Sequence, residues 1–285
     1  MNPLQQLFQN KITNIFLDSG DPNETRQADI LLDRLDGQTT NPSLIAKSPE
    51  VQEFLKVRKF TRDELFDKYR QIAFEIQDIL PEGKISAEVY SDLNTEEYEL
   101  YNQAQEIAQW FPGIFVKLPI TAAGLATASR LVAEGISVNM TLCFSQDQAA
   151  AVHTATKNAQ AGAKVYVSPF IGRLDDIGQN GGDLIRNIQK MYMDWGSHVG
   201  VLGASIRSIE HIKTCTTEQI SAITIPYKLI KEINDGTVAT VAPAVLSPII
   251  YKDLKDLSWD QYTIEHELTK KGLEKFAADW NALCE

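Results

Sequence analysis

Short runs of apolar, β-branched residues alternate along the chain with longer segments of helical periodicity. Each run is bounded by polar residues and is followed by enough residues for a crossover helix. Helix-start signals lie between the runs: Ser48 precedes a first-turn proline, and Ser145 to Gln148 has the spacing of a capping box. The predicted strands are residues 12–18, 37–41, 84–90, 114–118, 137–142, 163–168, 199–204 and 222–225.

Strand–helix units that follow one another without a Ser-, Pro- or Gly-rich linker predict an α/β fold, a single (β/α)8 TIM barrel formed by residues 1–285 as one domain. An open doubly wound sheet is the alternative. That sheet would need a Gly-x-Gly-x-x-Gly turn after its first strand or a Gly-Lys-Ser/Thr phosphate loop, and the sequence has neither. Residues 227–285 predict additional C-terminal helices, with an amphipathic stretch over 264–283 on the outside or rim of the barrel.

Composition narrows the classes of partner. The 285 residues include 27 Lys and Arg against 38 Asp and Glu, a formal net charge of −11, so we expect neither nucleic acid nor membrane partners. No apolar run approaches the roughly 20 residues that span a bilayer, and the N-terminus lacks a signal-peptide pattern, which indicates a cytoplasmic protein. The three cysteines and four histidines show neither disulfide nor metal-ligand spacing.

One lysine interrupts the most apolar of the predicted strands. Lys117 lies within Ile-Phe-Val-Lys-Leu-Pro, residues 114–119, with apolar neighbours on both sides. Burial of an unpaired ammonium costs several kcal/mol. Lys117 is therefore paired, located at an exposed strand end, or used in chemistry, and the residue alone does not decide between an ion pair and a reactive amine.

Lys117 is one of several polar residues near the ends of the predicted strands, and a barrel has its active site where the strands finish. Residues two apart on a strand share a face, so Asn139 lies on the same face as Thr141. Each of these residues could instead cap a helix, Asn41 above all because a proline follows it, and Glu88 could pair with Lys84. The residues that seven of the strands bring to this rim are Asp18, Asn41, Glu88, Lys117, Thr141, Ser168 and Ser205.

The lysine determines the chemistry that this set could support. A desolvated amine can attack a ketone to form a Schiff base, an electron sink for breaking the adjacent carbon–carbon bond. Asp18 and Glu88 are the carboxylates available for proton transfer, and the Asn, Ser and Thr side chains suit sugar hydroxyls. Arg173 and Arg207 follow the sixth and seventh strands, where barrels often bind phosphate. For both, the alternative is a surface salt bridge, for instance between Arg173 and Asp175 or Asp176.

Six segments match a known family in the same order along the chain: Phe-Leu-Asp-Ser-Gly (16–20), Thr-Thr-Asn-Pro-Ser-Leu-Ile (39–45), Val-Lys-Leu-Pro (116–119), Asn-Met-Thr-Leu (139–142), Val-Ser-Pro-Phe-Ile-Gly-Arg (167–173) and Gly-Ala-Ser-Ile-Arg (203–207). They resemble the transaldolase family, most closely its small bacterial and archaeal branch. The resemblance implies a class I aldolase barrel that needs neither metal nor organic cofactor. It also implies transfer of a dihydroxyacetone unit from fructose 6-phosphate or sedoheptulose 7-phosphate to an aldose phosphate, a reaction of the pentose phosphate pathway.

The resemblance also implies a role for each matching residue. Lys117 would form the Schiff base and Asp18 would take the proton from the C4 hydroxyl. Glu88 with Thr141 would position the catalytic water. Substrate contacts are implied for two groups, Asn41, Asn139 and Ser168 at the hydroxyls, and Arg173, Ser205 and Arg207 at the phosphate.

Fructose-6-phosphate aldolases, which release free dihydroxyacetone, are the nearest alternative. They carry glutamine in place of Glu88 and tyrosine in place of Phe170 in the substrate pocket, so this chain is more similar to the transferases. A barrel that only binds sugar phosphate is the alternative of another class. Gln38 and Tyr90 depart from the family pattern and could alter the pocket, and the longer C-terminal region leaves a homo-oligomer open.

Overall fold

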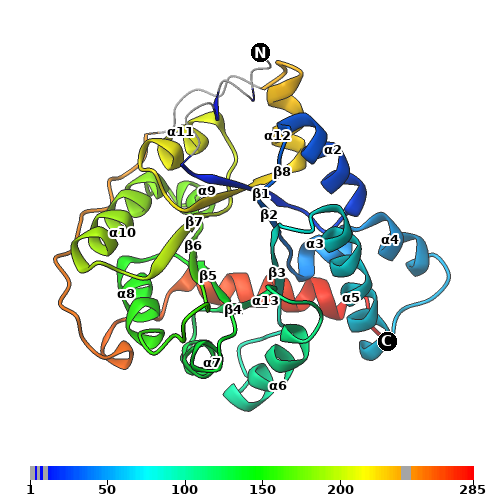
Figure 1. Cartoon of the computed structure of the whole chain (residues 1–285), viewed down its shortest axis with the longest axis horizontal. Helices are drawn as coiled ribbons and strands as arrows, with labels where there is room; N and C mark the ends of the chain where they lie inside the picture. Colours follow the sequence, from blue (N-terminus) through cyan, green and yellow to red (C-terminus); the bar gives the residue numbers. More distant parts are fainter. Residues whose placement is uncertain (1–3, 5–6, 9–11, 239–244) are drawn as a thin grey trace.

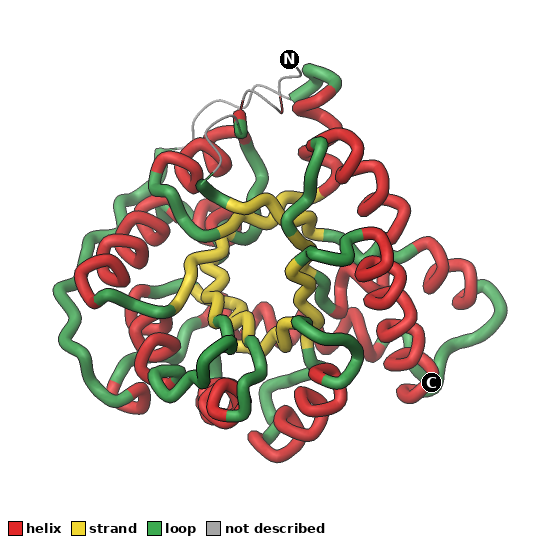
Figure 2. Tube along the Cα trace, in the orientation of Figure 1, coloured by secondary structure: helices red, strands yellow, loops and turns green. Residues whose placement is uncertain are grey.

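The computed structural model describes residues 4, 7–8, 12–238 and 245–285, and its centre is a closed barrel of parallel strands (Figure 2). Each strand pairs with the next one along the chain, and β8 closes the ring on β1. All eight predicted strands are confirmed, and with them the (β/α)8 barrel. The strands are β1 Asn14–Asp18, β2 Gly37–Thr39, β3 Lys84–Glu88, β4 Phe115–Pro119, β5 Val138–Cys143, β6 Val165–Pro169, β7 Val199–Gly203 and β8 Ala222–Pro226.

Helices between the strands form the outer layer of the barrel (Figure 1). At the start of α8 the Ser145 hydroxyl accepts a hydrogen bond from the Gln148 N–H (3.1 Å), which is one half of the predicted capping box; the Gln148 side chain accepts from the Phe144 N–H (2.7 Å). Ser48 before α4 makes no side-chain cap. The helices are α2 Pro22–Leu32, α3 Pro42–Lys47, α4 Pro49–Leu55, α5 Arg62–Ile79, α6 Glu97–Ala108, α7 Ala122–Ala133, α8 Gln146–Ala155, α9 Ile171–Asp175, α10 Gly181–Trp195, α11 Ile209–Thr217 and α12 Tyr227–Asn234.

The barrel interior changes from apolar to polar along its axis. Its lower part is filled by an apolar cluster, in which the ring of Phe16 meets the ring of Tyr166 edge to face at 6.0 Å. Side chains two residues apart on a strand share a face, so polar residues follow the cluster further along the same strands. The cluster closes the lower end and leaves the C-terminal end for a polar site. It consists of Phe16, Phe115, Tyr166, Leu202 and Ala222.

A strap of extended chain follows the barrel, an element that the apolar pattern did not reveal. Residues 245–258 contain no helix and run outside α8 and α10 (Figure 1). The side-chain amide of Gln146 in α8 both donates to the Lys252 carbonyl (2.6 Å) and accepts from the Lys252 N–H (2.9 Å). Asn187 in α10 donates to the Ile249 carbonyl (2.9 Å). A short 3-10 helix, η1 Trp259–Gln261, then leads into the last helix.

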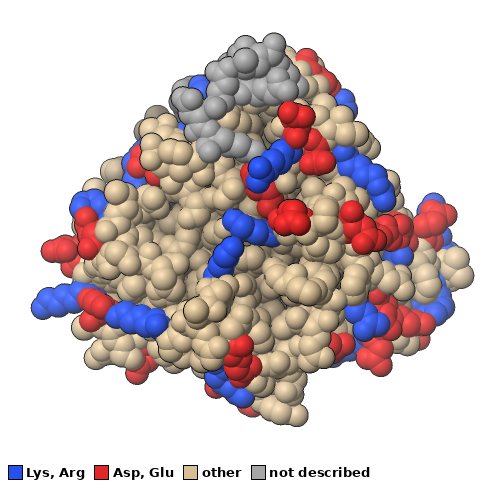
Figure 3. Space-filling model, viewed as in Figure 1, with Lys and Arg blue, Asp and Glu red and all other residues tan. Residues whose placement is uncertain are grey.

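The last helix, α13 Glu267–Asn281, packs at the C-terminal mouth of the barrel, behind the strands in Figure 1. It packs closely at Gly272, where a Cβ would lie 2.6 Å from a methyl of Leu142, so that side chain would have to shift. The predicted amphipathic helix is thus confirmed at the rim. Figure 3 shows the barrel face turned away from α13, where acidic and basic side chains are interspersed. No helix in the described part of the chain is long and apolar enough to cross a membrane.

The β4–α7 junction offers a test of the close packing that positions the strands. A Cβ on Gly124, in the first turn of α7, would lie 2.0 Å from the Pro119 carbonyl oxygen, so the backbone would have to move. We expect Gly124→Ala to lower the free energy of unfolding by about 2–4 kcal/mol in urea titrations. Ser129→Ala in the same helix is the control and should stay within about 0.5 kcal/mol of wild type. Equal effects of the two variants would contradict this packing.

Candidate active site

The C-terminal mouth of the barrel opens into a cavity of about 240 Å³. The structure brings all of the predicted site residues together here. Two of them, Glu88 and Asn139, lie beneath the cavity, each in contact with a residue that lines it, Lys117 and Ser168 respectively. The predicted residues that line the cavity are Asp18, Asn41, Lys117, Thr141, Ser168, Phe170, Arg173, Ser205 and Arg207.

Lys117 is buried and paired. Its side chain is 4% exposed, its Nζ lies 2.9 Å from Glu88 Oε2, and it donates to the Thr40 carbonyl at 3.2 Å. The strand register causes this contact, since Glu88 is the partner of Lys117 across β3 and β4. Lys84, the alternative partner for Glu88, lies at the opposite end of β3 against the hydroxyl of Tyr166 (3.2 Å).

The position of Lys117 within its strand corrects the prediction. β4 continues to Pro119, so Lys117 lies in the middle of the strand and not at its end. Its neighbours Val116 and Leu118 belong to the apolar layer between strands and helices, whereas Phe115, two residues earlier, belongs to the barrel interior. Lys117 therefore points into the barrel with Phe115. The apolar residues beside it in the sequence pack outward and do not surround its amine.

Two carboxyl groups accompany the amine. Asp18, at the end of β1, accepts a hydrogen bond from the Thr39 hydroxyl (2.8 Å), and Glu88 is almost fully buried. Desolvation by burial raises the pKa of both Asp18 and Glu88 above the ordinary value, and outweighs the opposite effect of the nearby Lys117 ammonium. Carboxyl groups with raised pKa beside an amine in one cavity are suited to proton transfer.

Two buried oxygen atoms in this region lack a hydrogen bond from the residues that the structure describes. Thr141 Oγ1 has no partner, and Glu88 Oε2 has only its ionic contact with Lys117. Because buried polar atoms are nearly always hydrogen-bonded, such atoms in a cavity indicate groups available to a ligand or water.

The polar residues at the cavity floor are held by one another. Asn139 donates to the Ser86 hydroxyl (3.2 Å) and accepts from the Ser168 hydroxyl (2.6 Å), so Asn139 and Ser168 form a pair on adjacent strands. Asn41 lies beyond the end of β2 and caps α3, where its Oδ1 accepts from the Leu44 N–H (2.9 Å). The capping interpretation therefore applies to Asn41, and its amide nitrogen is the group left to face a ligand.

The two arginines differ in their surroundings. The Arg173 guanidinium lies over two rings, Phe170 at 5.3 Å and Phe276 at 5.5 Å, and burial lowers the pKa of Arg173 from its ordinary value. The salt bridge to Asp176 is made by Arg207 instead. Two aromatic faces hold the Arg173 side chain without neutralising its charge.

Sequence reasoning missed the residues that α3 and α13 add to the cavity. Asp279 in α13 accepts from the Ser43 hydroxyl and pairs with Lys275, so the two helices meet across the mouth. The position of an active site at strand ends does not reveal side chains that a C-terminal helix contributes. The added lining residues include Ser43, Leu44, Lys47, Lys275, Phe276 and Asp279.

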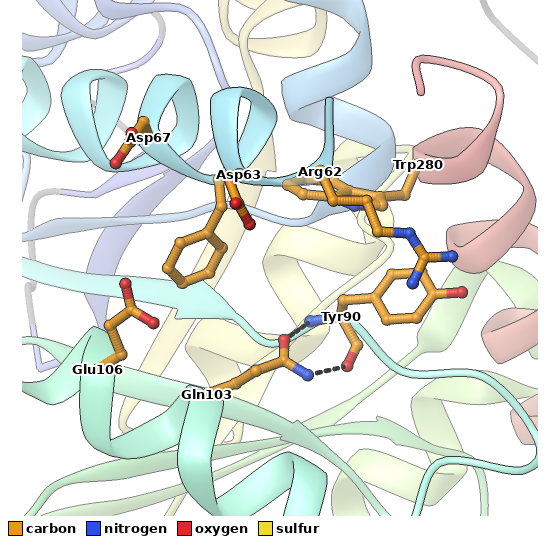
Figure 4. Close-up of a pocket in the computed structure, with 8 residues that line it drawn as sticks. Arg62, Asp63, Asp67, Tyr90, Gln103, Glu106 and Trp280 are labelled. Atoms are coloured by element: carbon orange, nitrogen blue, oxygen red, sulfur yellow. Dashed lines mark hydrogen bonds between the residues drawn. The ribbon is translucent and has the colours of Figure 1, made fainter. Parts of the chain in front are cut away.

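The two departures from the family pattern, Gln38 and Tyr90, do not line this cavity. Gln38 donates to the Ser19 carbonyl and accepts from the Thr25 hydroxyl, both at 2.8 Å. Tyr90 lines a separate hollow of about 330 Å³ between α5, α6 and α13. Figure 4 shows this hollow, with Arg62 extended over the Tyr90 ring.

Comparison with known proteins identifies the family. Residues 15–285 match the family described as Transaldolase/Fructose-6-phosphate aldolase. A probable transaldolase of Dehalococcoides mccartyi is 34% identical over 269 residues, which cover 94% of this chain and 98% of that protein. One from Caulobacter sp. (strain K31) is 36% identical over 93% of this chain and 95% of its own, and one from Maricaulis maris is 37% identical over 86% and 87%. The chain belongs to the transaldolase/fructose-6-phosphate aldolase family and is a transaldolase-type enzyme.

The raised pKa of Asp18 predicts a pH-dependent gain in stability when its charge is removed. The folded state favours the neutral carboxyl, so in wild type the ionised group costs stability as the pH rises from the unfolded pKa near 4 through the folded pKa. We expect the thermal midpoint of Asp18→Asn to match wild type near pH 4 and to exceed it by an amount that grows as the pH rises above 4, up to the folded pKa. Asp253→Asn, at an exposed carboxylate, is the control. A wild-type advantage that grows with pH would contradict the assignment.

Proposed function

We propose that this protein is a transaldolase that uses Lys117 as a Schiff-base nucleophile. It would transfer a dihydroxyacetone unit from fructose 6-phosphate or sedoheptulose 7-phosphate to an aldose phosphate. The observation that carries the proposal is the buried Lys117 amine, 2.9 Å from Glu88 in the mouth of a barrel of this family. The proposal places the enzyme in the pentose phosphate pathway of the cytoplasm and requires no metal or organic cofactor.

Imine formation is the first stage of the proposed reaction. Glu88 takes a proton from the Lys117 ammonium, and the neutral amine attacks the ketose C2 carbonyl to form a carbinolamine. Proton transfer to the C2 hydroxyl releases water and leaves a protonated imine. Thr141 Oγ1, which has no hydrogen-bond partner among the described residues, and Glu88 Oε2, whose one contact is the ion pair with Lys117, support the role of these residues in holding this water, which returns for hydrolysis when the product leaves.

Carbon–carbon cleavage is the second stage. Asp18 removes the proton of the C4 hydroxyl, the C3–C4 bond breaks, and its electron pair moves into the imine to form an enamine. The aldose phosphate leaves with a C4 aldehyde. The enamine then attacks the aldehyde of the acceptor, and Asp18 returns its proton to the new hydroxyl. The raised pKa of Asp18 strengthens it as the base in this step.

Substrate binding divides between the floor and the rim of the cavity. The Asn139–Ser168 pair and the amide nitrogen of Asn41 suit the hydroxyls of the three-carbon unit. At the rim, Arg173, Ser205 and Arg207 suit the phosphate, with Arg207 exchanging its carboxylate partner for the phosphate.

Phe170 supports transfer over release of free dihydroxyacetone. Its ring packs against Phe144 at 5.6 Å and beneath the Arg173 guanidinium. A phenyl ring offers no hydroxyl that could hold water beside the enamine and promote its protonation, so the enamine persists until an aldehyde arrives. A fructose-6-phosphate aldolase is the alternative function, because the same lysine would serve both reactions.

Reductive trapping tests the nucleophile. With fructose 6-phosphate and borohydride, we expect peptide mapping to find a reduced three-carbon adduct on Lys117 in wild type and none in Lys117→Met. Lys84→Met, which alters the lysine at the lower end of the barrel, should still be trapped. Adding erythrose 4-phosphate should yield sedoheptulose 7-phosphate, whereas accumulation of free dihydroxyacetone would favour the aldolase. An unmodified Lys117 would rule out the proposed mechanism.

Phe276 allows a test of the phosphate site. Removing its ring leaves Arg173 with one aromatic face, so Phe276→Ala should raise the KM for fructose 6-phosphate roughly five- to tenfold and change kcat less. The matched control is Leu273→Ala, which removes a buried apolar side chain of the same helix away from the cavity. The control should lose stability and retain its KM. Equal KM values in both variants would argue against the role of Phe276.

A further inference from the structure

Tyr69 reaches the catalytic region from outside the barrel. It belongs to α5 and is 1% exposed, with its ring against Trp110 (5.4 Å) and against Trp280 (6.0 Å), a residue that lines the hollow in Figure 4. Its hydroxyl lies 2.6 Å from Thr40 Oγ1 and 2.8 Å from the backbone nitrogen of Glu88. Burial raises the pKa of Tyr69 well above its ordinary value, so the hydroxyl stays neutral.

The direction of these hydrogen bonds follows from their partners. The Thr40 hydroxyl donates to the Ser86 carbonyl at 2.7 Å, and a carbonyl can only accept. Thr40 Oγ1 is therefore the acceptor from Tyr69, and the Tyr69 oxygen accepts from the Glu88 N–H. A one-way chain results, from the Glu88 N–H through the two hydroxyls to the Ser86 carbonyl.

This series of hydrogen bonds joins Thr40 and Glu88, the two residues that contact the Lys117 amine. Lys117 Nζ contacts the Thr40 carbonyl at 3.2 Å and Glu88 Oε2 at 2.9 Å. Thr40 lies just beyond the end of β2, and Glu88 ends β3, so both are at points where the strand ladder finishes. The hydroxyl of Tyr69 ties these two strand ends to each other.

We infer that Tyr69 is a positioning residue for Lys117, which it serves by holding the Thr40 carbonyl and the Glu88 carboxylate at the distances that aim the amine. The inference rests on the proposed function of Lys117 as nucleophile. Without the hydroxyl, the buried Glu88 N–H loses its acceptor and Thr40 loses its donor. Both segments can then shift, and small displacements of a reacting group slow its attack.

Paired Tyr→Phe variants test the inference. Tyr69→Phe, which removes two hydrogen bonds, is compared with Tyr192→Phe, which removes a buried hydroxyl and one hydrogen bond, to the Ala149 carbonyl (2.7 Å), at the α8–α10 contact. Both variants should lose thermal stability, and Tyr69→Phe should lose more because it breaks two hydrogen bonds. Only Tyr69→Phe should reduce kcat and the single-turnover rate of borohydride trapping, by about tenfold, while its KM for fructose 6-phosphate stays within about twofold of wild type.

A second variant interrupts the same series of hydrogen bonds at Thr40. Thr40→Val removes the acceptor of the Tyr69 proton, and combining it with Tyr69→Phe should reduce kcat little more than either change alone, because both remove the same link. Multiplicative losses of kcat would overturn the inference. So would a Tyr69→Phe variant whose kcat equals that of Tyr192→Phe, or one that changes only KM.

Reductive methylation with formaldehyde and cyanoborohydride separates this inference from the proposed function. Absence of ketose trapping in wild type would overturn the function, yet the methylation rate of Lys117 would still report how firmly its amine is held. We expect a rise of at least about threefold in Tyr69→Phe and none in Tyr192→Phe, because a released amine is more accessible to a small aldehyde. Equal methylation rates in the two variants would overturn the positioning role.

Discussion

The contact between the Lys117 ammonium and the Glu88 carboxylate, 2.9 Å apart inside the barrel, is the interaction on which the rest of the site depends. Placing two charged groups in a protein interior costs several kcal/mol per ion and requires further polar partners. The register of β3 and β4 sets the two residues side by side, and the Thr40 carbonyl supplies a second contact to the amine. The surrounding polar residues follow from this requirement.

The barrel meets that requirement by dividing its interior into two levels. On β1, β4 and β6, an aromatic residue of the lower cluster is followed two positions later by a polar residue of the site, as in Phe115 and Lys117. The lower level closes the barrel to water, and the upper level collects the reactive groups. The C-terminal segment completes the site from above, because α13 places Phe276 over Arg173 and Trp280 against Tyr69.

Much of this arrangement was predictable from local pattern. The alternation of strands and helices, and the parity that puts Asn139 with Thr141, depend only on residues near each other in the chain. The errors have a common cause. Lys117 was expected at a strand end, and Glu88 had Lys84 as a candidate partner. Both points depend on where a strand stops or on which neighbour a side chain meets, and neighbouring elements decide this.

The sequence by itself predicted the eight strands, a barrel in place of an open sheet, and the identity of the polar residues near its mouth, because hydrophobic periodicity and the alternation of strands with helices are local properties. Only the tertiary structure decided what each polar residue contacts. In the folded protein Asp176 pairs with Arg207, and the Arg173 guanidinium lies over two aromatic rings. Tyr69 and α13 contact a site that is built by strands far from them in the sequence. Those contacts arise from strand register and helix packing over long sequence separations, which no local pattern encodes.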